Sequence, residues 1–471
     1  MSPYRLPPIV LLAFAVLAPA ARAAPQLAPL FRDHAVLQRE KPVPVWGTAV
    51  PGEHVSVSFA GQSVGATAGT DGHWIAVLAP LATNPIGSDL TVAGKQTAVV
   101  HDVVVGEVWL CSGQSNMEFA VNDSGLGSHV ENAAAEVASA RYPLIRQFKV
   151  ARSASPAPLD SAGGDWRLCT PATVGSFTAV DYFFARDIYG RIGVPVGIIN
   201  SSWSGTPIEA WMSPASLAAF PGFSNGHAAG AASGSVDPWI PSSVFNGMIH
   251  PLLPYAIRGV LWYQGESNVG RAASYAVQFP ALIASWRAHF GCGDVPFFWV
   301  QLANFKAAAD GRGDQWAYLR EAQSRALALP ATGQAVAIDI GEAGNLNPRN
   351  KQEVGRRLAL IAKAEVYSIS VDYSGPVFSR ADIDGAAMRV HFIFTGEGLT
   401  ASGRPLQSFE LAGADRVFHP ATAVIEGDSV VVRSQWVRQP VAVRYAWANA
   451  PDANLFNGAG LPAAPFRSDD W

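Results

Sequence analysis

The feature that most constrains the fold is an alternation of two patterns between about residues 103 and 367. Short apolar runs, as expected for buried strands, are separated by longer stretches with helical spacing. In residues 351–366, for example, Val354, Leu358 and Ile361 are spaced so that they share one helix face. This alternation predicts βαβ units, and therefore an α/β domain in which helices cover both faces of a parallel sheet. The strands are expected at residues 103–110, 144–150, 194–200, 257–263, 296–303 and 334–340, and the helices at residues 180–189, 275–288, 318–329 and 351–366.

Two regions with shorter alternating segments flank this domain. Residues 24–102 contain strand-like segments broken by turn residues, which predicts a small β-sandwich-like domain. That domain is interpreted either as a carbohydrate-binding module or as a structural unit packed on the central domain. Alternation with period two returns after residue 368, as in residues 388–392. We therefore expect three domains, at residues 24–102, 103–367 and 368–471.

The first 23 residues have the pattern of a cleavable export signal. Arg5 is followed by an unbroken apolar stretch at residues 9–17, which is too short to span a bilayer comfortably, and Ala21 and Ala23 are small residues suited to cleavage. The sequence thus predicts a secreted or periplasmic protein without a membrane segment after cleavage. In such a compartment two of the three cysteines could pair, and the spacing of Cys111, Cys169 and Cys292 does not say which.

Composition bears on the partners of the protein. A formal net charge of -4 gives no basic footprint for nucleic acid. The cysteines lack the spacing of zinc ligands. Aromatic residues near the motifs described next are candidate sugar-stacking platforms, or else simply core residues: Trp203, Trp211, Trp262 and Tyr263.

The first of three motifs that follow predicted strands spans residues 106–117. Here a strand runs into a turn containing Gly113, which would present the hydroxyl of Ser115 at the edge of the sheet. A serine hydroxyl becomes a nucleophile only beside a base, and backbone N–H groups of such a turn can hold the oxyanion of a tetrahedral intermediate. Ser115 is therefore the candidate nucleophile, although many serines in Gly-x-Ser patterns merely cap turns.

The other two motifs supply candidate partners for that serine. In residues 199–209, Gly205 could bring its backbone N–H close to a substrate oxygen, or the segment is a structural turn. In residues 262–268, Glu266 could orient a catalytic histidine, and the Gln264 side chain could donate an N–H group to an oxyanion; alternatively Glu266 caps a helix. Ligand sites in such sheets form outside the carboxyl ends of the strands, which is where all three motifs lie.

Together these motifs resemble the sialate O-acetylesterase family of the SGNH (GDSL-type) hydrolase superfamily. The resemblance covers nearly the whole chain after residue 23, including residues 36–39, 245–251, 350–358, 454–455 and 465–467. It implies a three-layer α/β/α hydrolase domain with a parallel sheet, flanked by N-terminal and C-terminal β-rich regions. It also implies a carbohydrate esterase that removes acetyl groups from sugars, with an acetylated glycan as partner and without a metal or organic cofactor.

The resemblance also implies roles for individual residues. Ser115 would be the nucleophile and Glu266 the acid of the catalytic triad. The oxyanion hole would consist of the backbone N–H groups of Ser115 and Gly205 and the side chain of Gln264. We further expect substrate contacts from four residues, namely Gln114, Asn116, Trp203 and Asn246.

One position departs from the family pattern. The base of the family is a histidine in an Ile-His-Pro run ahead of the Asn-Lys helix, and this chain has Asn347 there. An asparagine amide cannot accept a proton at neutral pH, and loss of a triad base typically lowers the rate by several powers of ten. Three interpretations compete. The chain is a pseudo-esterase that still binds acetylated sugars, or it is an active esterase that uses another base. In the third interpretation the protein is active and this position is substituted or has been assigned to the wrong residue. Candidates for another base are His129, His227, Asp339 and Glu342.

Overall fold

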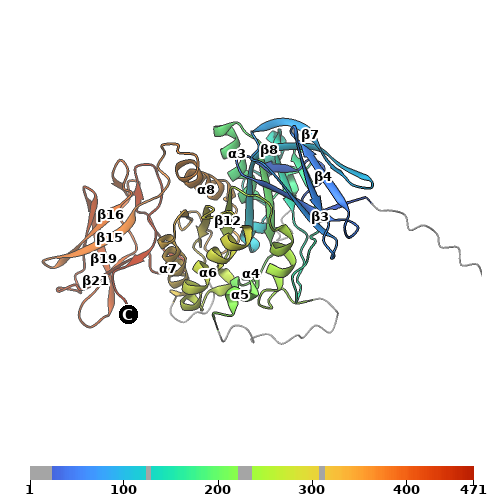
Figure 1. Ribbon diagram of the computed structural model, residues 1–471. Coiled ribbons are helices and arrows are strands. Elements are labelled where there is room, and N and C mark those ends of the chain that lie inside the picture. The colour runs from blue at the N-terminus through green and yellow to red at the C-terminus, as the bar shows by residue number, and fades with distance from the viewer. Residues whose placement is uncertain (1–23, 123–128, 221–235, 307–312) are drawn as a thin grey trace, which may run out of the picture.

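The computed structural model describes residues 24–122, 129–220, 236–306 and 313–471 (Figure 1). The predicted export signal and His227 lie outside the described residues. Figure 1 shows N-terminal strands in blue and C-terminal strands in orange on opposite sides of a central region that contains both helices and strands. The chain is thus a mixed α/β protein with β-structure at both ends, in the order expected from the sequence.

The N-terminal strands form two sheets. In β6 (His73–Leu78) exposed and buried residues alternate along the whole strand, as the period-two pattern predicted. One sheet contains β1 (Gln26–Leu27), β3 (Val43–Thr48) and β6; in the other, β4 (His54–Phe59), β5 (Gln62–Thr67) and β7 (Asn84–Ala93) lead to β8 (Thr97–Gly113), with which β2 (Val36–Gln38) also pairs.

β8 joins the N-terminal region to the central sheet. This strand of 17 residues pairs with β7 in its first part and with β11 and β12 in its last part. The domain boundary expected at residues 102 and 103 therefore falls inside one continuous strand. The central sheet has the order β10-β9-β11-β8-β12-β13-β14, in which only β10 is antiparallel to its neighbour. Its further strands are β9 (Tyr142–Lys149), β10 (Trp166–Cys169), β11 (Val196–Ser202), β12 (Gly259–Tyr263), β13 (Phe297–Gln301) and β14 (Thr332–Val336).

Four long helices accompany this sheet, and each lies where the apolar spacing predicted one. α3 (Ala179–Ile192) packs against α8 (Lys351–Glu365), and α6 (Ala272–Phe290) packs against α7 (Gln315–Arg325). The predicted apolar face of α8 is buried, because Val354, Leu358 and Ile361 are at most 2% exposed. The shorter helices are α1 (Ser115–Glu118), α2 (Ala133–Ser139), α4 (Ile208–Trp211) and α5 (Pro214–Leu217).

The C-terminal region is built around a seven-stranded sheet with a core of its own. Leu411, Val430 and Tyr445 are fully buried in this core. The guanidinium of the fully buried Arg320 in α7 joins the region to the central one, because it donates hydrogen bonds to the carbonyl groups of Leu302, Ala303, Ala448 and Asn449. The sheet contains β15 (Val377–Asp384), β16 (Ala387–Ile393), β18 (Phe409–Ala412), β19 (Phe418–Glu426), β20 (Ser429–Arg433), β21 (Ala442–Tyr445) and β23 (Phe466–Arg467), and β17 (Leu399–Thr400) pairs separately with β22 (Phe456–Asn457).

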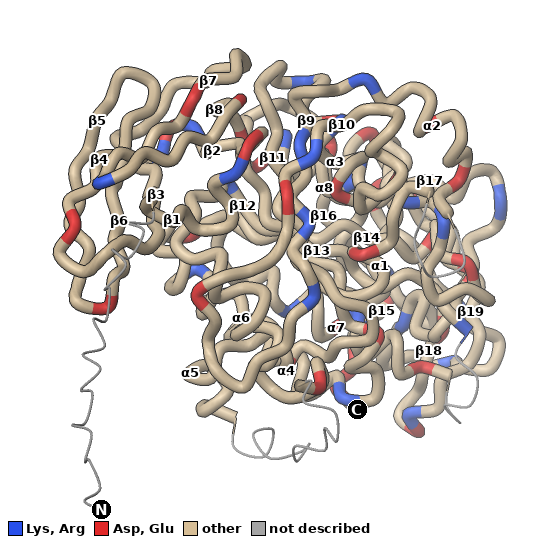
Figure 2. The backbone as a smooth tube through the Cα atoms, turned by 90° about the vertical axis from the view of Figure 1, so that its right-hand side faces the viewer, with Lys and Arg blue, Asp and Glu red and all other residues tan. Residues whose placement is uncertain are grey.

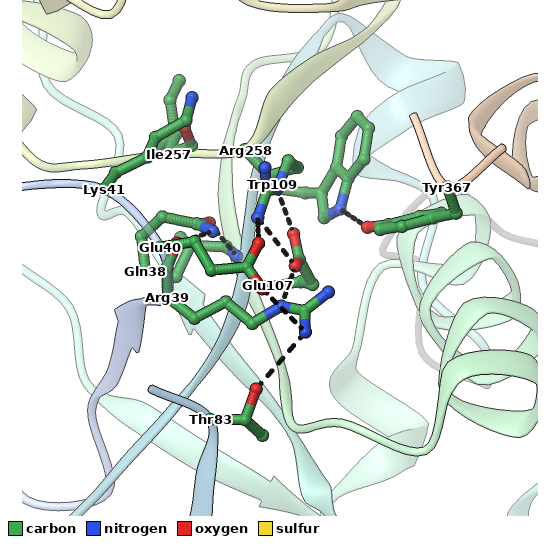
Figure 3. A network of polar contacts seen from close by, with 11 residues as sticks. Gln38, Arg39, Glu40, Lys41, Thr83, Glu107, Trp109, Ile257, Arg258 and Tyr367 are labelled. Carbon is green, nitrogen blue, oxygen red and sulfur yellow. Dashed lines mark hydrogen bonds and ion pairs between the residues drawn. The ribbon is translucent and has the colours of Figure 1, made fainter. Parts of the chain in front are cut away.

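A buried carboxylate ties the N-terminal region to the central sheet (Figure 3). The side chain of Glu107 in β8 is fully buried and accepts hydrogen bonds from the guanidinium groups of Arg39, which follows β2, and Arg258, which precedes β12. Arg258 donates to both carboxylate oxygens, at 2.5 and 3.0 Å, and also contacts Glu40 at 3.1 Å. Glu107 lies six residues before the end of β8. The network is therefore distant from the sheet edge that carries the three motifs.

Several global expectations can be compared with the structure. Cys111, Cys169 and Cys292 are all free, so no two of them are paired. In Figure 2, Lys and Arg are interspersed with Asp and Glu along the chain. Within residues 24–122, 129–220, 236–306 and 313–471, no helix is long and apolar enough to cross a membrane, and no group of three His, Cys, Asp or Glu side chains is placed to hold a metal ion.

Candidate active site

The three motifs meet at one edge of the central sheet. Ser202 at the end of β11 and Tyr263 at the end of β12 both lie beside Gly113 at the end of β8 in the strand register. The segments that follow these strands therefore begin at the same level on three adjacent strands. The chain order also reverses around β8, since β9 and β11 lie on one side of it and β12 on the other. A crevice at such a reversal is the usual ligand site of an open parallel sheet.

A glycine makes the turn into the nucleophile segment possible. Gly113 has a φ of 142°, and a Cβ atom added there would lie 2.1 Å from the carbonyl oxygen of Tyr263. The next residue, Gln114, donates its backbone N–H to that same oxygen at 3.0 Å. The chain thus passes tightly over the end of β12 and begins α1 at Ser115, which is 4% exposed. Only a residue without a side chain fits this approach.

Hydrogen bonds between the three loops hold them together. The side-chain oxygen of Gln114 accepts a hydrogen bond from the backbone N–H of Ser267 at 3.2 Å. The hydroxyl of Ser267 in turn donates to the carbonyl of Gly205 at 2.9 Å. Glu118, in the same turn of helix as Ser115, accepts the backbone N–H of Ser204 at 2.9 Å. The nucleophile turn, the Gly205 loop and the Glu266 loop therefore form one connected unit.

Two backbone N–H groups at this edge are available to a ligand. Those of Ser115 and Gly205 have no acceptor among the residues that the structure describes. Gly205 has a φ of 80°, in the left-handed region that glycine adopts without strain. Ser115 begins a helix, where N–H groups have no partner within the helix. Unpaired N–H groups of this kind can stabilise the negative oxygen of a tetrahedral intermediate.

Gln264 has a different role from the oxyanion donor that we expected. Its side-chain nitrogen donates to the carbonyl of Thr206 at 3.3 Å and to Oδ1 of Asn268 at 2.7 Å, and the residue is fully buried. The orientation of Asn268 is fixed because its own amide nitrogen donates to Glu209 at 3.1 Å. Both hydrogens of the Gln264 amide are therefore occupied. The structure makes Gln264 a residue that positions the Gly205 loop.

Asn116 links the residues around Glu266. Its side-chain nitrogen donates to Oε1 of Glu266 at 2.5 Å and to the carbonyl of Leu346 at 3.0 Å. Its side-chain oxygen accepts a hydrogen bond from the ammonium group of Lys351 at 2.5 Å. Asn116 is 1% exposed, so it acts inside the protein and is not the substrate contact that we expected. These bonds place the turn containing Asn347 beside Glu266.

Two buried oxygen atoms at this place have no hydrogen-bond partner. They are Oε2 of Glu266 and Oδ1 of Asn347, considering the described part of the chain. Burial raises the pKa of Glu266, and the hydrogen bond from Asn116 and the charge of Lys351 oppose that increase. Both atoms are hydrogen-bond acceptors whenever Glu266 is ionised.

No described side chain contacts the hydroxyl of Ser115 as a base. Nine of the ten histidines are described, and His129 is exposed without a resolved partner near the site. The other eight belong to strands or contacts elsewhere: His34 with Asp102, His54 with Thr67, His73 in β6, His101 with Asp89, His250 with Leu159, His289 with Ser285, His391 with Asp382, and His419 with Trp436.

The two carboxylates that we considered as bases are occupied as well. Asp339 forms a two-pronged ion pair with Arg357, at 2.6 and 2.7 Å. Glu342 accepts the backbone N–H of Arg349 at 2.8 Å, and its pKa is lowered by this and neighbouring hydrogen bonds despite partial burial. A general base at this position would need a raised pKa, so the hydrogen bonds of Glu342 do not favour that role.

The expected substrate contacts are only partly where a substrate could reach them. Asn246 is 2% exposed and donates to the carbonyl of Ser155 at 3.2 Å, which is a structural contact. Gln114 is likewise 2% exposed. Trp203 is partly exposed, with the guanidinium of Arg152 5.8 Å from its ring centroid. The other proposed stacking platforms, Trp211, Trp262 and Tyr263, are fully buried core residues.

The structure adds an aromatic residue that the sequence analysis missed. Trp239 is 42% exposed, and its ring lies 3.8 Å from the position of a Cβ atom on Gly205. It stands outside every predicted strand and helix, so no periodic pattern pointed to it. Together with Trp203 it puts two partly exposed rings beside the Gly205 loop.

A cavity of about 450 Å³ has Glu118 in its wall, whereas neither Ser115 nor Gly205 lines it. Lys149, Arg152 and Arg167 are among the lining residues. Arg152 pairs with Glu118 at 2.6 Å, whereas Lys149 and Arg167 have no ion-pair partner in the described portion of the chain. The cavity therefore places positive charge beside the helix that begins at Ser115, with Glu118 and Asp165 as acidic residues in the same lining.

Comparisons with known proteins identify relatives over the same region. The family model of "Carbohydrate esterase, sialic acid-specific acetylesterase" matches residues 105–363. The sialate O-acetylesterase of Pongo abelii is 30% identical over 92% of this chain and 90% of that protein, and the human sialate O-acetylesterase is 33% identical over 74% and 72%. Among solved structures, a carbohydrate acetylesterase from Xanthomonas citri is similar with a TM-score of 0.87 and 45% identity, covering 95% of this chain and 100% of that one.

Proposed function

Because the chain belongs to the sialic acid-specific acetylesterase family of carbohydrate esterases, we propose that it hydrolyses O-acetyl esters of sugars with Ser115 as the nucleophile. One observation carries this proposal. Ser115 and Gly205, whose backbone N–H groups are both unpaired among the described residues, follow adjacent strands at the carboxyl edge of the sheet. The proposal includes the three-layer SGNH arrangement of the central domain. It also includes export through residues 1–23, which gives access to extracellular or periplasmic glycans.

The reaction proceeds by acyl transfer. Oγ of Ser115 attacks the acetyl carbonyl carbon and gives up its proton, and the carbonyl oxygen becomes an anion. The N–H groups of Ser115 and Gly205 donate hydrogen bonds to that anion, and each such donor typically contributes about 3 kcal/mol to the transition state. The sugar hydroxyl leaves with a proton, and water then cleaves the acetyl-serine ester to release acetate.

The proton of Ser115 needs an acceptor, and Asn347 cannot serve. In the family reaction a histidine between Glu266 and Ser115 would take it. Oε2 of Glu266, which has no hydrogen-bond partner among the described residues, would accept a hydrogen bond from that histidine. We propose that the base is either His129 or His227, or that turnover is slow because no base is present.

The lack of a described base favours a second candidate function, namely a sugar-binding protein that turns over little or not at all. The test is acetate release from acetylated sugars by the wild type and by S115A, with S112A as the matched control. The hydroxyl of Ser112 is buried without a hydrogen-bond partner in the same strand, so its removal leaves the turn intact. Loss of activity only in S115A supports the esterase. A wild type that binds acetylated sugar in calorimetry but releases no acetate supports the binding protein.

We infer that the substrate is an acidic sugar, from the description of the family model as sialic acid-specific and from the basic residues of the cavity that Glu118 lines. Sialic acid carries a carboxylate, and the lysine and arginine side chains of the cavity are complementary to it. We expect a higher kcat/KM for an O-acetylated sialic acid than for an acetylated neutral sugar. In the double variant K149Q/R167Q this preference should shrink while release from the neutral sugar stays the same. A preference unaffected by the double variant would assign recognition to other residues.

A further inference from the structure

A buried lysine is connected to Glu266, the proposed acid of the site. Lys351 is the first residue of α8 and is fully buried. Its ammonium group donates to Oδ1 of Asn116 at 2.5 Å and lies over the rings of Phe119 and Tyr263, at 5.0 and 5.3 Å from their centroids. On the other side of the same amide, Asn116 donates to Glu266 at 2.5 Å. The cation and the carboxylate are thus joined through one side chain.

We propose that Lys351 is a positioning residue of the esterase site, which through Asn116 keeps the Glu266 carboxylate ionised and fixes the turn that carries Asn347. This inference rests on the proposed function, in which Glu266 is the acid of the triad. Lys351 touches neither Ser115 nor a substrate, so its effect on the reaction is indirect.

The geometry explains why an amide stands between the two charges. The oxygen of an amide accepts and its nitrogen donates, so the Lys351 ammonium and the Glu266 carboxylate each bind the end of Asn116 that suits them. The same nitrogen also holds the carbonyl of Leu346, the residue before Asn347. By holding the Asn116 amide, Lys351 therefore also fixes the two groups that this amide binds. They are the Glu266 carboxylate and the turn that contains Asn347.

The charges around the pair support a mutual stabilisation. Burial is the largest influence on both groups: it raises the pKa of Glu266 and lowers the pKa of Lys351 to about 7. Each charge counteracts the shift of the other, and Glu342 adds a weaker negative charge toward Lys351. The remaining neighbour that titrates is Tyr263, whose pKa burial raises, so it is neutral at these pH values. Removing the cation should therefore leave the buried carboxylate harder to ionise.

The experiment measures the titration of Glu266 directly. The protein is labelled with ¹³C on glutamate side-chain carboxyl carbons, and the Glu266 signal is identified by its absence in E266Q. In K351M we expect the midpoint for Glu266 to move upward by about one pH unit. K363M is the matched control, because Lys363 lies on the same helix and pairs with Asp187, away from the site. The control should leave the midpoint unchanged.

Activity provides a second readout. In K351M we expect kcat for acetate release to fall, KM to stay within about twofold, and the acid limb of the pH profile to shift upward with the midpoint of Glu266. A merely structural lysine would reduce the folded fraction without moving that limb. An unchanged Glu266 midpoint in folded K351M would overturn the inference.

The inference can be tested even if K351M does not fold, and even if the esterase proposal fails. By reciprocity, E266Q should lower the midpoint of Lys351, followed through ¹³C-labelled lysine side chains. A Lys351 midpoint that stays in place in E266Q would contradict the coupling. Acetate release that persists in S115A would instead reject the proposed function, while the coupling between Lys351 and Glu266 would still be measured.

Discussion

At the scale of single residues, the proposed reaction depends on position 347, where the chain has an asparagine in place of the base histidine. The proposed esterase site combines a serine at the strand end, unpaired backbone N–H groups and the carboxylate of Glu266. Among the described residues, Oε2 of Glu266 has no hydrogen-bond partner, and neither has Oδ1 at position 347. An imidazole there would donate to the carboxylate with one nitrogen and accept the serine proton with the other.

The variant N347H should therefore gain activity. If the base is simply absent, kcat for acetate release rises by about 100-fold or more, which is the usual contribution of a positioned general base. The double variant S115A/N347H serves as the control and should lose the gain. Strong wild-type turnover that N347H does not increase would contradict the prediction and direct attention to His129 or His227.

Trp239 is the residue through which the sugar ring is expected to bind. Replacing it with alanine removes an exposed ring beside Gly205, so KM for an acetylated sugar should rise by about 3- to 10-fold, in line with the strength of a ring contact. Hydrolysis of p-nitrophenyl acetate, which has no sugar, should be unaffected. W436A is the control, because Trp436 is 58% exposed in the C-terminal region. Equal changes of KM in W239A and W436A would show that Trp239 does not belong to the substrate site.

At the scale of elements, the site depends on how β8 passes into α1. Five residues at the end of β8 pair on both sides with parallel strands, and the strand then turns within two residues into the helix of the nucleophile. The turn presses against β12, so the position of Ser115 is set by the contact between two strands. The short loop itself has little freedom to move it.

The variant G113A tests this contact. An alanine Cβ atom would lie 2.1 Å from the carbonyl of Tyr263 at a φ that disfavours side chains. We expect the free energy of unfolding to fall by about 2–4 kcal/mol and acetate release to be lost. G65A is the control, since a Cβ atom on this strand glycine has its nearest neighbour at 3.9 Å. Urea unfolding followed by fluorescence gives the comparison, and a fully active G113A would show that the turn is adaptable.

At the scale of the whole molecule, the two ends of the central sheet have different tasks. One end carries the proposed chemistry. The other carries the Glu107 network, which joins the N-terminal region through Arg39 to the central region through Arg258 (Figure 3). Six residues of extended strand separate Glu107 from Gly113, which corresponds to roughly 20 Å.

Neutralising Glu107 should therefore affect stability and spare the chemistry. In E107Q two arginines lose their buried counter-charge, and the free energy of unfolding should fall by about 3–5 kcal/mol, measured by urea unfolding. The acetate release per folded molecule should be unchanged. D382N, which alters exposed pairs with Arg380 and His391, should change stability by less than about 1 kcal/mol. A loss of activity in folded E107Q would indicate coupling along β8.

The sequence by itself determined the types of the elements and their order. The periodicity of apolar residues is a local property, so β8, β9, β11, β12, β13, β14 and the four long helices were predicted close to where they lie, whereas the short β10 was not predicted. The meeting of the three motifs also followed, because parallel strands bring their carboxyl ends to one edge. The boundary expected at residue 102 falls inside β8, and nothing in the alternation of side chains reveals that one strand continues across it.

Only the tertiary structure decided which polar atoms are free and which are occupied. Asn116 meets Glu266 and Lys351 across 150 and 235 residues of sequence, and Gln264 meets Thr206 across 58. A sequence pattern identifies residue types, whereas a hydrogen bond depends on distance and direction between groups that folding brings together. For that reason the hydrogen bonds of Gln264, Asn116 and Asn246 favour positioning roles, which the sequence did not indicate. Lys351 lies in the family-like residues 350–358, but only the structure shows its contact with Asn116, and Trp239 stands outside every predicted element.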